Sequence, residues 1–170
     1  MNKSILLKDR PKGKPSLSDF EITEIEKPSP KEGEILLKTK YISVDPYLRG
    51  RMRDEESYIP PFELNKPIES MLVAEVIESK NKDFKTGDVI SGMLKWELYQ
   101  THSGENLNKI DTNLAKPSAY LGILGLTGLT AHLALKHIGK PEKGETLVVS
   151  GAAGAVGSVA GQIGKIKGCR

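Results

Sequence analysis

The sequence has little cysteine, few aromatic residues and no long hydrophobic run. Its 170 residues include one cysteine, Cys169, which excludes an intramolecular disulfide and a zinc cluster built from cysteines. No apolar run is long enough to span a bilayer, and residues 1–10 are too polar for a secretory signal. The net charge of +3 is too small to favour nucleic acid or a membrane surface as a partner. We therefore expect a soluble cytoplasmic protein.

Helical periodicity is also scarce in residues 1–120, where short β-type runs alternate with turns. Short strands separated by Gly, Pro and Asn predict a small antiparallel barrel. The predicted strands are residues 5–8, 20–26, 34–44, 71–79, 88–90 and 96–100.

One segment interrupts the strand pattern after residue 44. Asp45 is expected to cap a short helix that has Pro46 at its first position. The simpler interpretation is a capped helix with solvated arginines. The functional interpretation places Tyr47 at the mouth of a cleft, where its hydroxyl donates a hydrogen bond to a substrate oxygen.

From Tyr120 onward, apolar residues spaced three and four apart predict a helix that ends at Gly139. The helix is apolar nearly all round, so we expect it to be buried between two domains. Thr127 at its start either caps it or faces a cofactor. The three histidines have no carboxylate or cysteine at ligand spacing, so we interpret them as structural.

A glycine turn follows the apolar run at 146–150, which reads as a buried parallel strand. The helix after the turn presents its N-terminus, whose free N–H groups attract a pyrophosphate. Gly154 allows close approach of the phosphates, and Gly157 allows the helix to pack tightly on the strand. Ala152 replaces the first glycine of G-x-G-x-x-G, so an ordinary glycine-rich turn of another α/β protein remains an alternative.

Three segments carry a family resemblance, in this order: residues 42–49 (ISVDPYLR), 121–131 (LGILGLTGLTA) and 151–158 (GAAGAVGS). The chain resembles the medium-chain dehydrogenase/reductase superfamily. Within it, the chain is similar to the zinc-free prostaglandin reductase and leukotriene hydroxydehydrogenase branch of NADP-dependent alkenal double-bond reductases.

The resemblance implies an α/β protein with two parts. Residues 1–120 would form a GroES-like β-barrel substrate domain. Residues 121–170 would form an interdomain helix and the first βα unit of a truncated Rossmann NADP-binding domain. The rest of that domain is absent, so we interpret the chain as an N-terminal half that is inactive alone. The complete enzyme would be a homodimer.

The implied reaction is NADPH-dependent reduction of the C=C bond of α,β-unsaturated aldehydes and ketones. By resemblance, Gly154, Ala155, Val156 and Gly157 bind the pyrophosphate, Thr127 lies beside the nicotinamide, and Tyr47 positions the substrate. Zinc-dependent relatives hold their metal at two positions that correspond here to residues 43–44 and 71–72. Ser, Val, Met and Leu stand there, and none of them replaces a thiolate or imidazole ligand, so we expect no metal.

Two other functions remain open. A quinone reductase of a sister branch has a similar glycine turn, but the segment DPYLR at residues 45–49 favours the alkenal reductases. A non-enzymatic GroES-like binding module would have no use for residues 146–168, with their pattern of strand, turn and helix.

Overall fold

Antiparallel strands make up the first of the two units into which the chain divides, Met1–Thr112, and the second unit is Asn113–Arg170. The computed structural model describes all residues 1–170. The strands are β1 (Asn2–Leu7), β2 (Phe20–Ile25), β3 (Ile35–Ile42), β4 (Glu69–Ser79), β5 (Val89–Lys95), β6 (Tyr99–His102) and β7 (Asn108–Lys109).

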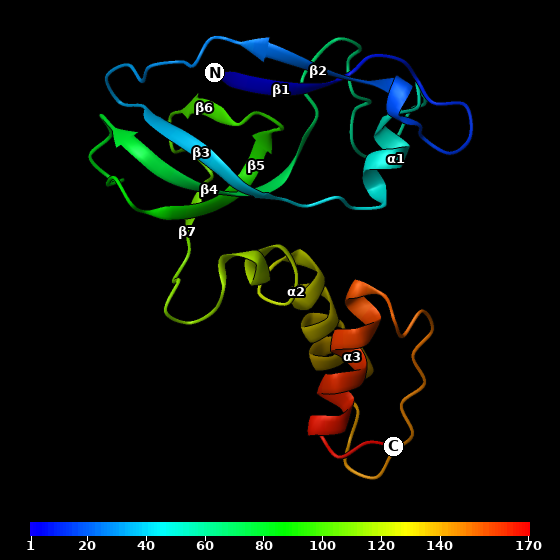
Figure 1. The fold of residues 1–170 in the computed structure, drawn as a ribbon. Coiled ribbons are helices and arrows are strands. Elements are labelled where there is room, and N and C mark those ends of the chain that lie inside the picture. Colours follow the sequence, from blue (N-terminus) through cyan, green and yellow to red (C-terminus); the bar gives the residue numbers. More distant parts are fainter. The chain divides into compact units, whose positions relative to one another are not determined.

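These strands form two antiparallel sheets (Figure 1). One has the order β6-β3-β4-β5-β7, and the other pairs β1 with β2. Single bridges connect β1 to the rest of the unit, at Ser4 with Glu97 and at Leu6 with Pro67. The predicted fold class, with antiparallel strands of a GroES-like domain, is confirmed.

The centre of the first unit is the inward face of β3, β4 and β5. Ile35 and Leu37 of β3 pack with Leu72 and Val76 of β4, and all four are fully buried. Burying each such side chain stabilises the fold by about 1.5–3 kcal/mol. A second buried cluster contains Leu7, Leu48, Met52, Phe62 and Ile68 and lies under α1 (Tyr47–Arg51).

Several strand predictions differ from the structure, and the strand predicted at 88–90 is the start of β5, which continues to Lys95. Trp96 lies before β6 rather than in it, because its indole N–H donates to the buried Ser70 hydroxyl at 2.8 Å and its backbone pairs with Ile5 and Ile68. The two-residue strand β7 is absent from the prediction, since it is too short to carry a period-two pattern.

Helices make up the second unit. They are the 3₁₀ segment η2 (Pro117–Leu121), α2 (Leu126–Leu133), the π-helical segment η3 (Ala134–Gly139) and α3 (Ala155–Ile166). A further short 3₁₀ segment, η1 (Leu17–Asp19), precedes β2 in the first unit. None of the helices has both the length and the apolar character needed to cross a membrane.

Helices α2 and α3 lie side by side (Figure 1). Ala131 of α2 and Ala160 of α3 belong to one buried cluster, and side chains this small let two helices approach closely. Glycines are also buried on both helices, but Gly128 lies against the backbone of Ile123 and Gly164 against the Leu147 side chain. Of the larger apolar residues on α3, Val159 and Ile163 pack against this cluster, while Val156 is 38% exposed and Ile166 is 84% exposed.

The expectation that the helix after Tyr120 is buried all round was wrong for this chain. Leu126, Leu129 and Leu133 are exposed, whereas Ala131 on the same helix is buried in one cluster with Ala160 of α3. The predicted end at Gly139 is confirmed, although the last turn is π-helical and Lys140 adopts a left-handed conformation with φ 42°.

Residues 146–150, which the sequence predicts as a buried strand, belong to no sheet ladder. Leu147 and Val149 turn towards the helices, while Val148 is 87% exposed. The only strand-like pairing is with Arg170, whose N–H donates to the Glu145 carbonyl at 2.8 Å and whose carbonyl accepts from the Leu147 N–H at 2.8 Å. These two bonds are the pattern of a parallel bridge. A strand needs hydrogen-bond partners along its whole backbone, and here Arg170 alone supplies two of them.

Candidate functional site

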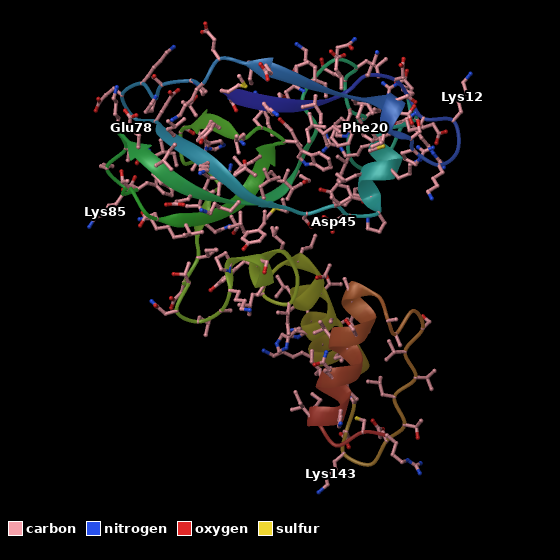
Figure 2. The ribbon with its side chains drawn as sticks, in the orientation of Figure 1. Lys12, Phe20, Asp45, Glu78, Lys85 and Lys143 are labelled. Carbon is pink, nitrogen blue, oxygen red and sulfur yellow. The ribbon has the colours of Figure 1, made fainter.

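The short helix α1 begins directly after the chain leaves β3, and Figure 2 labels Asp45 in this connection. Asp45 does not cap the helix as predicted. Its carboxylate instead accepts a hydrogen bond from the Ser43 hydroxyl at 2.7 Å, and Pro46 already has helical φ and ψ angles. The first turn closes through the backbone, with the Leu48 N–H donating to the Asp45 carbonyl at 3.1 Å.

Arg49 attaches α1 to the loop between β1 and β2, in which Figure 2 labels Lys12. Its Nη2 donates to the carbonyl oxygens of Pro11 at 3.0 Å and Gly13 at 2.6 Å. Its Nε also donates to Gly13, at 3.1 Å, whereas Nη1 is buried without a partner. Arg49 is therefore a structural side chain and not one of the solvated arginines that the sequence suggested.

Tyr47 lines a surface recess of about 190 Å³ on the first unit, together with Arg51, Tyr58 and Ile59. The ring of Tyr47 packs against the buried cluster under α1, and its hydroxyl has no hydrogen-bond partner in the chain. Burial raises the pKa of Tyr47 above its ordinary value, the Asp45 carboxylate adds to the rise, and the Arg51 guanidinium opposes it. The phenol therefore stays protonated at neutral pH and is free to donate.

The two positions compared with metal ligands in the sequence are neighbours in the structure. The Ser43 N–H donates to the Met71 carbonyl at 2.9 Å, and the Ser70 hydroxyl donates to the Ser43 carbonyl at 2.8 Å. Leu72 is fully buried in the core of the first unit. No group of three or more His, Cys, Asp or Glu side chains gathers anywhere in residues 1–170 in a way that would hold a metal ion.

We expect the protein to bind no stoichiometric zinc, because hydroxyl, thioether and alkyl groups stand where thiolate and imidazole ligands would be required. Elemental analysis of protein purified without chelators measures this directly. About one zinc per chain would contradict the expectation.

The glycine turn is built as the sequence predicts at its centre. Gly151 adopts φ 61°, and Gly154 is the N-cap of α3 with extended φ and ψ. The first backbone bond of the helix runs from the Ser158 N–H to the Gly154 carbonyl at 2.9 Å. The N–H groups of Ala155, Val156 and Gly157 have no acceptor in the chain. Three free donors at a helix N-terminus fit an anionic oxygen group such as a pyrophosphate.

Gly157 is required by the turn itself. A β-carbon on Gly157 would overlap the Gly151 carbonyl oxygen and approach the Ala152 Cα to 2.9 Å, and both are backbone atoms that cannot swing away. A β-carbon on Gly154 would come within 3.1 Å of the Gly151 oxygen. The sequence analysis expects Gly157 to let the helix pack on residues 146–150, but Gly164 is the glycine that lies against the Leu147 side chain. Sequence reasoning missed Gly164, although its seven-residue spacing from Gly157 places both on one helix face.

Thr127 lies in the first turn of α2, where its hydroxyl donates to the Gly122 carbonyl at 3.0 Å. This bond ties the helix start to the preceding loop.

His102 stabilises the loop after β6: its Nδ1 accepts a hydrogen bond from the Gly104 N–H at 3.0 Å, and burial lowers the pKa of His102. The structure thus brings Gly154, Ala155, Val156 and Gly157 together in one turn of the second unit and places Tyr47 in the first unit.

Comparison with known proteins identifies relatives for both units. Residues 3–110 match the family model described as the N-terminal domain of oxidoreductase. The NADPH-dependent curcumin reductase of Escherichia coli is 44% identical over 99% of this chain and 49% of its own length. The NADP(+)-dependent 2-alkenal reductase of Nicotiana tabacum is 41% identical over 99% of this chain and 50% of its own length.

Solved structures show the same likeness. The crystal structure of CurA from Vibrio vulnificus in complex with NADPH superimposes with a TM-score of 0.90 and 40% identity, over 99% of this chain and 50% of that chain. The chain therefore spans about half the length of the relatives it matches.

Proposed function

Since the chain belongs to the medium-chain dehydrogenase/reductase superfamily, with the N-terminal oxidoreductase domain at residues 3–110, we propose that it is the N-terminal half of an NADPH-dependent reductase. Its substrates are α,β-unsaturated aldehydes and ketones, whose C=C bond it reduces. The observation that carries the proposal is the turn at residues 151–157, where three unpaired N–H groups stand at the start of α3.

Similar proteins support the choice of cofactor and substrate. The names of two relatives specify NADPH or NADP(+), one of them is a 2-alkenal reductase, and the CurA structure contains NADPH. A 2-alkenal is by definition an α,β-unsaturated aldehyde. The substrate domain at residues 1–120, the cofactor-binding segment at residues 121–170 and the homodimer are parts of the same proposal.

Each site residue then has one role. The N–H groups of Ala155, Val156 and Gly157 hold the pyrophosphate, and the absence of a side chain at Gly154 lets it approach. Thr127 lies beside the nicotinamide. When bound, the cofactor supplies the hydride that reaches the β-carbon of the substrate. Tyr47, which stays protonated at neutral pH, donates a hydrogen bond to the carbonyl oxygen and so stabilises the negative charge that develops there.

A substrate panel tests the proposed reaction. The complete protein, meaning this chain with the second half that the proposal implies, is expected to convert a 2-alkenal or an enone with NADPH to the saturated carbonyl compound. Product identification by NMR distinguishes the outcomes. An allylic alcohol would show that the carbonyl is reduced instead, and quinones reduced faster than any enone would favour a quinone reductase.

A further inference from the structure

Arg51 is the arginine of α1 whose Nη1 and Nη2 atoms both lack a hydrogen-bond partner. The other arginine of this helix, Arg49, donates to carbonyl oxygens, and Arg53 just beyond the helix lies 3.6 Å from the Glu55 carboxylate. Arg51 donates only through Nε, to the Pro60 carbonyl at 3.0 Å. Its Nη1 and Nη2 make no hydrogen bond and no ion pair in the chain.

The guanidinium of Arg51 is nevertheless held in place. It lies over the ring of Phe62 with 4.0 Å between the guanidinium carbon and the ring centroid. Phe62 is itself buried, and its backbone N–H donates to the Arg51 carbonyl at 2.7 Å. One face of the guanidinium and its Nε are thus fixed by the protein, while the edge formed by Nη1 and Nη2 remains available. A guanidinium edge of this kind matches the two oxygens of a carboxylate.

Arg51 and Tyr47 line the same recess and are four residues apart on α1, so they share one face of the helix. The volume of about 190 Å³ is below the roughly 300–1,000 Å³ of pockets that enclose a whole small molecule. The recess therefore suits one end of a ligand and not all of it.

No carboxylate in the chain forms an ion pair with Arg51. Asp54 pairs with Arg10 at 3.3 Å, and Glu55 pairs with Arg53. The recess thus contains a fixed cation whose Nη1 and Nη2 offer several N–H donors to an anion, while the single Tyr47 hydroxyl proton is kept for the carbonyl oxygen.

We propose that the recess beside α1 binds a carboxylate carried by the substrate, with Arg51 as the specificity-determining residue. The preferred substrates are then enones or enals that end in a carboxylate, separated from the double bond by a short chain. This inference rests on the proposed function, because it assigns a substrate class to the same site.

Kinetics with matched substrates test the proposal. A straight-chain enone ending in a carboxylate is compared with its methyl ester, which differs only in charge. In the complete protein, KM for the acid is expected to be at least tenfold below KM for the ester. Arg51→Gln should remove this difference, and Arg51→Lys should keep part of it because a single ammonium lacks the two-pronged edge. The control Arg53→Gln should leave the ratio unchanged. Equal KM values for acid and ester in the wild type would overturn the proposal, and so would an unchanged ratio in Arg51→Gln.

A binding measurement separates failure of this proposal from failure of the proposed function. Hexanoate and hexanol are titrated into the wild-type chain and into Arg51→Gln, with NMR shifts as the readout, and neither probe needs to be reduced. Hexanoate should bind at least tenfold more tightly than hexanol to the wild type only. If no enone is reduced but this preference appears, the proposed function fails and the carboxylate subsite stands. If enones are reduced but hexanoate shows no preference, the subsite is wrong.

Discussion

Replacing Gly157 by alanine is expected to lower the affinity of the complete protein for NADPH by well over tenfold, a loss above about 1.4 kcal/mol. The new β-carbon would overlap the Gly151 carbonyl oxygen and press on Ala152, so the turn must move. Because the free N–H groups of Ala155 and Val156 are part of that turn, they would no longer converge on the pyrophosphate. Isothermal titration calorimetry with NADPH measures the loss.

Gly161→Ala is the matched control for this substitution. It adds the same methyl group to the same helix, but at a position with no atom within 4 Å of the new β-carbon. Its affinity for NADPH should equal that of the wild type, and its free energy of unfolding should rise by up to about 1 kcal/mol because alanine favours helix over glycine. Equal affinities in all three proteins would mean that the phosphates bind elsewhere.

Removing the hydroxyl of Tyr47 in Tyr47→Phe is expected to lower kcat/KM for enones by an amount equivalent to about 1–3 kcal/mol. The hydroxyl has no partner in the chain, so the substitution breaks no internal hydrogen bond, and the ring keeps its place over the buried cluster. Affinity for NADPH should therefore stay unchanged while the reaction slows.

Tyr41→Phe provides the comparison for Tyr47→Phe. Tyr41 lies on β3, is 44% exposed and is outside the recess, so its loss of a hydroxyl should leave kcat/KM within about twofold of the wild type. If both variants retain wild-type kinetics, Tyr47 returns to the simpler interpretation of a packing residue.

The sequence predicts the elements that depend on local pattern. Alternating apolar residues and turn glycines are enough to place β2, β3 and β4 to within about two residues, and the run of glycines before α3 is enough to predict the turn at its start. Residues close together in the sequence determine these elements, and the structure contains each of them near its predicted position.

Features that depend on distant neighbours are not visible in the same way. Asp45 is a residue type that commonly caps helices, but its carboxylate accepts a hydrogen bond from the Ser43 hydroxyl instead. Residues 146–150 have the composition of a buried strand. A strand forms a ladder only when a second strand lies beside it and pairs with its backbone groups. The buried cluster shared by α2 and α3 contains Ala131 and Ala160, which carry little hydrophobic signal even though their small size lets the helices pack closely.

The candidate site likewise has one part that local sequence predicts and one part that depends on distant residues. The free N–H groups of the turn follow from the helix start alone, so the sequence was sufficient to predict them. The partner-free edge of Arg51 depends on Pro60 and Phe62, which lie nine and eleven residues further along the chain. Only the folded structure shows that Arg49 is used internally while Arg51 faces the recess.

Transfer of a labelled hydride tests the central claim most directly. The complete protein is given an enone and NADPH carrying deuterium at the transferable position of the nicotinamide, and the product is analysed by NMR. The account predicts a saturated ketone with deuterium on the former β-carbon. Deuterium on the carbonyl carbon, or an enone recovered unreduced while NADPH stays unoxidised, would contradict it.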